Sequence, residues 1–513
     1  MIPSPKKRLA FFFKRLHIDK LVLLLALLSS TLALDAQTQP KREFRGAWIQ
    51  AVNGQFRGKS TQSVQKMLLD QLDVLQKTGI NAIIFQVRVE ADALYDSPYE
   101  PWSRYLSGTQ GASPSPAWDP LAFMVEECHK RSMELHAWIN PYRAKTTLKN
   151  PTAQGSVLLE HPEWFKTYGD QLFFDPAFQE CRDHIVKVAS DIVSRYDVDG
   201  FHMDDYFYPY PSGSLEFPDQ SEYEKWGSGF ATIGDWRRHN VDLLIEQLSN
   251  AIRSLKPWVK FGISPFGIYR NQSSDPDGSK TNGLQNYDQL YADVLKWTSE
   301  GWVDYLVPQI YWQVGHPVAD FQELNAWWAR HNNGRRMYVG ESITNTIANP
   351  DPSNPSSHQM PLKMNMMRST EGIDGTCFWY AAALYENQGN YREALEQMYY
   401  PYMALQPTYP FLDDKAPKKP AKLKAVWTSD GYMLFWTAPK AKTVMDEAVT
   451  YVVYRFEKGQ KVDLDDPSRI LMLTRDNHLL LPYQDGTTRY TYVVTSLDRL
   501  QNESKAAKKK VRL

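Results

Sequence analysis

Two adjacent carboxylates, Asp204 and Asp205, end a short β-type run and are followed by aromatic residues and a proline. Side chains alternate between the faces of a strand, so His202, Asp204 and Tyr206 share one face and Asp205 lies on the other. Like charges this close raise one pKa, which keeps a carboxylic acid protonated near neutral pH, ready to donate its proton. A solvated pair of acids would not need the aromatic run behind it. The stretch therefore predicts a site.

Polar and aromatic residues also end other β-type runs. In a parallel α/β protein, the carboxyl ends of the strands meet at one site. Amides, phenols, indoles and acids can bind a hydroxyl-rich ligand and protonate an ether oxygen. The expected substrate-binding residues are Gln86, Arg88, Trp138, Asn140, Tyr142, Arg143, His202, Tyr206, Ser264, Gln309, Tyr311 and Trp312.

Three acids are candidates for catalysis. We expect Asp205 to be the general acid and Asp204 to orient it or to stabilise positive charge on a sugar, and the reverse assignment stays open. Glu341 is the candidate second carboxylate across the cleft. His202 and Asp204 have no third ligand at metal-site spacing, so neither a metal nor a cofactor is expected.

The elements that must position these residues alternate between strand and helix. The β-type runs are 45–52, 81–88, 135–143, 199–206, 260–267, 303–312, 337–343 and 375–383. Helix-period segments separate them; in 63–78 a stripe of Met67, Leu68, Leu72 and Leu75 ends at Gly79. About eight such repeats over roughly 340 residues predict a (β/α)8 TIM-like barrel over 42–408. An open doubly wound sheet would have fewer strands and usually a glycine-rich phosphate turn, which the sequence lacks.

The pattern changes near Tyr409. Prolines and lysines over 409–420 predict a stiff linker. Short alternating strands without helices follow at 423–428, 432–437, 451–456, 470–474 and 490–497, so 421–513 is expected to be a small β-sandwich. The basic tail, 505–512, is expected to be a solvated last strand and terminus.

The first 36 residues have the order of an export signal. Basic residues precede a short apolar run, Leu21 to Leu28, and small residues lead to Ala36. The run is short for a membrane span, so we expect cleavage before Gln37 and an exported protein, periplasmic or extracellular, with an uncleaved anchor as the lesser alternative. The three cysteines have no metal-ligand spacing and are expected to be buried free thiols. With 58 basic and 59 acidic residues, nothing in the charge favours nucleic acid.

Several motifs carry a family resemblance. They are FRGAW at 44–48, FQVR at 85–88, HAWINPYR at 136–143, DGFHMDDYFYP at 199–209, SPFG at 264–267 and PQIYW at 308–312. In this order, from about 43 to 383, they resemble the glycosyl hydrolase-like 10 family. The resemblance implies a TIM-like barrel, hydrolysis of sugars, and as substrate class the glycan strands of bacterial peptidoglycan stripped of their peptides. The C-terminal region is similar to a fibronectin type III module, in Trp436, 451–455 and 490–494.

A more distant likeness concerns mechanism. Chitinase-type barrels carry Asp-Gly-x-Asp-x-Asp-x-Glu on strand four, with the Glu as acid. The aligned positions here are Asp199, Gly200, His202, Asp204 and Tyr206. The chain departs at two of them, including the acid, so either Asp204 or Asp205 supplies the proton or the catalytic arrangement differs.

Two functions remain in competition. The first is an exported glycoside hydrolase that acts on a poly- or oligosaccharide through Asp204 and Asp205. The second is a carbohydrate-binding barrel without catalysis, favoured by the missing chitinase-type Glu.

Overall fold

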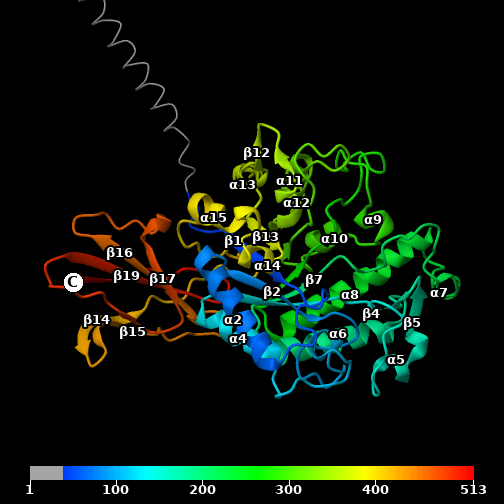
Figure 1. Cartoon of the computed structure of the whole chain (residues 1–513), viewed down its shortest axis with the longest axis horizontal. Coiled ribbons are helices and arrows are strands. Elements are labelled where there is room, and N and C mark those ends of the chain that lie inside the picture. Colours follow the sequence, from blue (N-terminus) through cyan, green and yellow to red (C-terminus); the bar gives the residue numbers. More distant parts are fainter. Residues whose placement is uncertain (1–38) are drawn as a thin grey trace, which may run out of the picture. The chain divides into compact units, whose positions relative to one another are not determined.

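Eight parallel strands close into a barrel, which confirms the predicted fold class (Figure 1). The structure is a computed structural model and describes residues 39–513, so the expected export signal lies outside it. The strand order around the barrel is β1-β2-β3-β7-β8-β9-β10-β13, and β13 pairs with β1. The strands are β1 Phe44–Ile49, β2 Ala82–Arg88, β3 Glu134–Ile139, β7 Gly200–Met203, β8 Lys260–Ile263, β9 Tyr305–Leu306, β10 Arg336–Ser342 and β13 Gly375–Trp379. Each predicted segment of the barrel overlaps one of these strands.

Amphipathic helices connect the strands, and α2 (Thr61–Thr78) shows why they form. The Ser60 hydroxyl caps its start by accepting from the Ser63 amide, and Gly79 ends it with a φ of 93°. The predicted stripe is on the buried face, where Leu68, Leu72 and Leu75 pack. The other helices are α3 Arg104–Ser107, α4 Pro120–Lys130, α5 Val157–Glu160, α6 Gln179–Arg195, α7 Gln220–Trp226, α8 Ile233–Leu255, α9 Asn286–Gln289, α10 Val294–Ser299, α11 Phe321–Arg330, α12 Ile343–Ile347, α13 Met360–Ser369, α14 Ala381–Tyr385 and α15 Tyr391–Ala394.

Two small sheets belong to the loops of the barrel. One consists of β4 (Arg143–Lys145), β6 (Gln171–Phe174) and β5 (Phe165–Tyr168), and the other pairs β11 (Pro350–Asp351) with β12 (Asn354–His358). Because β4 begins at Arg143, four residues after β3 ends, the first of these sheets holds this arginine beside the carboxyl end of β3.

Side chains that point into the barrel form a buried cluster of their own. It includes Phe44, Trp48, Trp138, Tyr305 and Tyr338. A larger cluster packs the outer faces of the strands against the helices. We call the carboxyl ends of the strands the mouth of the barrel and the amino ends its base. The interior is thus filled with side chains between mouth and base.

The C-terminal region consists of two antiparallel sheets, which we call the β-module. One sheet is β14-β15-β18 and the other β17-β16-β19-β20. Their strands are β14 Ala421–Thr428, β15 Gly431–Thr437, β16 Thr450–Glu457, β17 Ile470–Thr474, β18 His478–Leu480, β19 Arg489–Leu497 and β20 Ala507–Arg512. The five predicted strands are confirmed, and the basic tail forms a strand, β20, paired with β19.

The β-module contacts the base of the barrel. Leu500 packs into the interior cluster, and Arg499 pairs with Asp197 at 2.7 Å.

The expected linker begins at a residue that packs against the barrel: Tyr409 is fully buried and its hydroxyl lies 2.6 Å from that of Tyr338. Lys41, at the start of the described chain, pairs with Glu503 at 2.6 Å. Residues 41–513 accordingly form one compact unit.

Two further findings concern the cysteines and the lengths of the helices. Cys128, Cys181 and Cys377 are buried free thiols, as predicted. None of the helices within residues 39–513 is long and apolar enough to span a membrane.

Candidate active site

A cavity of about 320 Å³ lies at the mouth of the barrel. Nine of the predicted site residues line it, namely Gln86, Trp138, Arg143, Asp204, Asp205, Tyr206, Ser264, Gln309 and Tyr311. They come from strand ends or the loops directly after them. Parallel strands present their carboxyl ends to one site, and the cavity accordingly joins residues as far apart in the sequence as Gln86 and Tyr311, which are separated by 225 positions.

Asp204 is held by a chain of amides. The Asn140 side-chain amide donates to Asp204 Oδ2, and Gln86 Nε2 donates to Asn140 Oδ1 at 2.6 Å. Gln86 Oε1 in turn accepts from the backbone amides of Ala51 and Val52 at 2.8 and 3.0 Å. Both amide side chains are thereby fixed in orientation. The other oxygen, Asp204 Oδ1, is buried and has no partner within residues 39–513.

Asp205 has a different environment although it is the next residue. Its Oδ2 accepts a hydrogen bond from the Tyr210 hydroxyl. The side chain is 1% exposed, yet it borders the cavity. A hydrogen bond from a phenol stabilises the ionised form of a carboxylate.

The carboxyl groups influence each other. Burial, followed by the nearby Asp205 charge, raises the pKa of Asp204 well above the usual range of an aspartate. Burial also raises the pKa of Asp205, although the Tyr210 hydrogen bond opposes this. The pair therefore retains a proton at pH values where a free aspartate has lost it.

Arg143 is a cation that lines the same cavity as Asp204 and Asp205. Its Nε donates to the Val89 carbonyl at 3.0 Å, and its guanidinium lies 5.0 Å from the centre of the Tyr206 ring. It is 7% exposed, lines the cavity and forms no ion pair within 39–513. The charge of this guanidinium favours the ionised forms of Asp204 and Asp205, and its remaining donors can also bind an anionic group of a ligand.

Three tryptophans surround the cavity. The Trp379 ring lies 6.2 Å from both Trp48 and Trp138 and is edge-on to each, at interplanar angles of 65° and 70°. Trp48 and Trp379 were not predicted as site residues, nor were Val52, Asn53 and Tyr210. Trp48 and Trp379 occupy the ends of β1 and β13, so the strand-end rule applied to the first and last strands would have found them.

Six predicted site residues do not line the cavity. Asn140 supports Asp204 from behind, and His202 is fully buried one inward position below it. Arg88 pairs with Glu100 at 2.7 Å, and Tyr142 is fully buried. Trp312 packs edge-on against Phe266.

Glu341 is the sixth, and it is not a carboxylate facing the cleft. It is fully buried, accepts from Thr346 and pairs with Lys363 at 3.2 Å. The buried Lys363 charge compensates that of Glu341, which gives the pair a structural role. Residues 39–513 contain no group of three or more His, Cys, Asp or Glu side chains that could hold a metal.

The barrel and its site define the class of protein. A closed parallel barrel with paired carboxylates and aromatic rings at its mouth is the arrangement of TIM-barrel enzymes that act on carbohydrate. The family model of glycosyl hydrolase-like 10 matches residues 43–356, more than half of the chain. The protein belongs to this family.

Two relatives support the assignment. Glycosyl hydrolase YngK of Bacillus subtilis (strain 168) is 41% identical over 491 residues, covering 92% of this chain and 94% of the relative. Glycosyl hydrolase DigH of Escherichia coli (strain K12) is 42% identical over 288 residues, covering 54% of this chain and 65% of the relative. A solved structure, the glycoside hydrolase domain of PgaB from Bordetella bronchiseptica, is 12% identical with a TM-score of 0.46, covering 70% of this chain and 99% of that one.

Proposed function

We propose that the protein is an exported glycoside hydrolase that cleaves glycosidic bonds of a polysaccharide at the mouth of the barrel. The observation that carries the proposal is the pair Asp204 and Asp205, two buried carboxyl groups that share a cavity and whose pKa values burial raises. Hydrolysis of a glycosidic bond needs an acid that protonates the leaving oxygen and a negative charge near the developing positive charge of the sugar. The pair supplies both.

The environments of the two carboxyl groups favour the reverse of the roles expected from the sequence. Each accepts one hydrogen bond that favours its ionised form, Asp204 from Asn140 and Asp205 from Tyr210. At Asp204, however, the charge of Asp205 adds to burial in raising the pKa, and Oδ1 is buried without a hydrogen-bond partner within residues 39–513. We therefore assign Asp204 as the general acid and Asp205 as the carboxylate that stabilises the sugar cation. The Asp204 proton moves to the glycosidic oxygen as the bond to the anomeric carbon breaks with its electron pair. Water then adds to that carbon and releases a proton, which restores the protonated form of Asp204.

The substrate class is the one that the family resemblance implies, peptide-free glycan strands of peptidoglycan. Arg143 supports this part of the proposal. Removal of a peptide by hydrolysis of its amide bond leaves a free carboxylate on the strand, and Arg143 is a cation of the cavity that forms no ion pair at contact distance in the described chain. Trp48, Trp138 and Trp379 offer flat apolar surfaces to the faces of sugar rings.

Localisation and the β-module complete the proposal. The basic and apolar order of the first 36 residues supports export, which would bring the protein to a cell-wall substrate. We keep the fibronectin type III likeness for the β-module, which has the antiparallel sheets of such a fold.

Turnover of the purified protein tests the proposal. Peptide-stripped glycan strands, intact peptidoglycan, chitooligosaccharides and a panel of other polysaccharides are incubated with it, and new reducing ends are measured. We expect release from the stripped strands and little from strands that keep their peptides. Binding without products on every substrate would instead establish a carbohydrate-binding barrel.

A further inference from the structure

Four side chains form a hydrogen-bonded chain through the interior of the barrel. At the base, Glu134 Oε2 lies 3.1 Å from His136 Nε2. His136 Nδ1 lies 2.7 Å from the Tyr305 hydroxyl, and that hydroxyl lies 3.0 Å from His202 Nδ1. His202 is two residues before Asp204, so the chain ends one inward position below the proposed acid.

Glycines on the neighbouring strands make the space for this chain. A Cβ at Gly200 would lie 2.5 Å from the His136 ring, and one at Gly262 would lie 1.9 Å from the Tyr305 ring. Both distances are far below van der Waals contact. The two large polar rings therefore occupy slots that only glycine leaves open, and their positions are fixed by the backbone opposite them.

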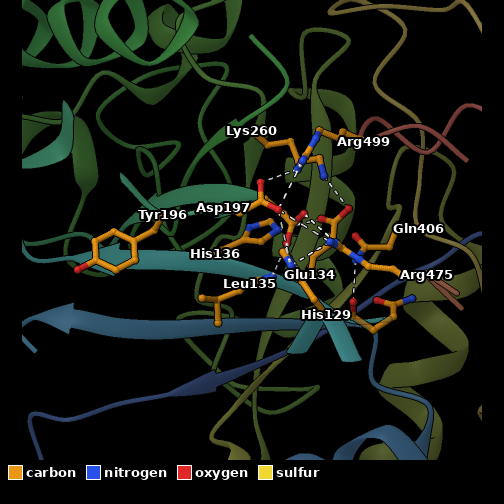
Figure 2. Close-up of polar contacts among 12 residues, drawn as sticks. His129, Glu134, Leu135, His136, Tyr196, Asp197, Lys260, Gln406, Arg475 and Arg499 are labelled. Atoms are coloured by element: carbon orange, nitrogen blue, oxygen red, sulfur yellow. Dashed lines mark hydrogen bonds and ion pairs between the residues drawn. The ribbon is translucent and has the colours of Figure 1, made fainter. Parts of the chain in front are cut away.

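Charges at the base set the direction of the first hydrogen bond. Lys260 Nζ and Gln501 Nε2, the latter from the β-module, donate to Glu134 Oε1 at 2.6 and 2.9 Å (Figure 2 shows Lys260 and Glu134). Burial alone would raise the pKa of Glu134, but the Lys260 charge and the His136 hydrogen bond lower it overall. An ionised carboxylate only accepts hydrogen bonds, so His136 Nε2 carries the proton.

The remaining donors follow from the first. Lys260 Nζ already compensates the Glu134 carboxylate at 2.6 Å, so the fully buried His136 ring needs only the one proton on Nε2; its Nδ1 then accepts from the Tyr305 hydroxyl. The Tyr305 oxygen in turn accepts from His202, which places the proton of His202 on Nδ1. Burial lowers the pKa of His202 well below its usual value, so this ring is neutral. Its Nε2 therefore has a lone pair, and this atom is buried without a partner within residues 39–513.

We propose that Glu134, His136 and Tyr305 hold His202 in the Nδ1–H tautomer, so that His202 Nε2 is a hydrogen-bond acceptor below Asp204. His202 is then a positioning residue that keeps the acidic proton of Asp204 in place, directly or through one water. Buried polar atoms normally have partners, and Asp204 Oδ1 and His202 Nε2 are two exceptions at adjacent inward positions of one strand. The role toward Asp204 rests on the proposed function, whereas the tautomer does not.

The tautomer can be measured without any substrate. The nitrogen-15 shifts of a histidine-labelled full-length protein distinguish protonated from unprotonated ring nitrogens, and the signals of His202 are assigned by their loss in a His202→Gln variant. We expect a protonated Nδ1 and an unprotonated Nε2 in the wild type. Tyr305→Phe should abolish this preference, because Nδ1 loses its acceptor. A protonated Nε2 in the wild type, or an unchanged tautomer in Tyr305→Phe, would overturn the proposal.

Kinetics test the link to Asp204. Tyr305→Phe should lower kcat about tenfold, the size expected for one hydrogen bond, with little change in KM. Tyr338→Phe is the matched control, since it keeps the ring that packs against Tyr305 and removes a buried hydroxyl that bonds to Tyr409 and to no member of the chain. Equal loss of activity in both variants at equal thermal stability would refute the positioning role. Failure of the proposed function would appear differently, as a correct tautomer in a protein without turnover.

Discussion

Two buried carboxylates, Asp204 at the mouth of the barrel and Asp199 at its base, have pKa values shifted in opposite directions. At the mouth, Asp204 has a second carboxylate beside it, and its pKa is raised. At the base, Asp199 lies on the same chain segment, five residues earlier, 2.8 Å from His129 Nε2 and 3.7 Å from Arg475 (Figure 2 shows His129 and Arg475). Burial alone would raise the pKa of Asp199, but His129, Arg475 and Lys260 lower it well below the usual range.

The difference separates stability from function. At the base, Asp199 and Glu134 have cationic or hydrogen-bonding partners that lower their pKa values, so their ionisation favours the folded state. Asp304, also at the base, has a raised pKa although it pairs with Arg253, so the contrast belongs to these residues and not to each end as a whole. At the mouth, ionisation of both aspartates is opposed, which favours chemistry at the expense of stability.

The largest expected effect is on turnover at the mouth. Asp204→Asn and Asp205→Asn should each lower kcat by about 10²–10⁴, the usual cost of losing an acid/base group, while the fold is retained. Asp170→Asn, in the exposed turn between β5 and β6, is the control and should leave kcat unchanged. Near-normal turnover in both mouth variants would refute the catalytic role of Asp204 and Asp205.

The corresponding change at the base should affect stability alone. Asp199→Asn removes a buried carboxylate from its contacts with His129 and Arg475 and should lower the free energy of unfolding by about 3 kcal/mol, measured by urea denaturation. Asp197→Asn is the matched control at the same interface. Its side chain is 42% exposed, so a loss below about 1 kcal/mol is expected. Equal stability of the two variants would contradict the contrast between the two ends, as would a loss of kcat in folded Asp199→Asn.

The pH dependence of stability should have opposite signs at the two ends. With the raised pKa of Asp204, the native state keeps a proton that the unfolded chain loses above about pH 4, so wild-type stability falls from there towards neutral pH. Asp204→Asn removes this titration and should gain on the order of 2 kcal/mol relative to wild type over that range. With the lowered pKa of Asp199, the stabilisation is present above about pH 4 and is lost as pH falls further. Urea midpoints at several pH values check both signs, and parallel curves for all variants would refute them.

The smallest effect concerns substrate affinity. Trp379→Ala removes one aromatic wall of the cavity and should raise KM about fivefold, close to 1 kcal/mol of binding, with a smaller change in kcat. Trp427→Ala is the control, because this tryptophan is 62% exposed on the β-module. An equal rise in KM for both would place sugar binding outside the mouth.

Much of the barrel could be predicted from the sequence because its signals are local. Each strand is a short apolar run between helix-period segments, and strand ends in a parallel barrel converge by geometry. That reasoning found Asp204, Asp205 and Gln309. Trp48 and Trp379, near the ends of the first and last strands, follow the same rule but were not among the predicted site residues.

Other features have no local signal. Tyr210 follows the end of β7 by seven residues, in a loop whose path no periodicity specifies. Glu341 has the sequence position of a site residue, and only its contact with Lys363 shows that it is structural. The contact of Arg475 with Asp199 joins residues 276 positions apart in different sheets. Such pairs depend on how the β-module docks, which short-range patterns do not encode.

The contacts of Lys41 and β1 have a consequence for the order of folding. Lys41 pairs with Glu503, 462 residues later, and β1 completes the barrel by pairing with β13. At synthesis rates of roughly 5–20 residues per second, the beginning of the barrel waits tens of seconds for these partners. Until they arrive, β1 has an open edge, a template for pairing with other chains. High contact order of this kind slows folding, so we expect aggregation through this edge to compete with folding over that interval.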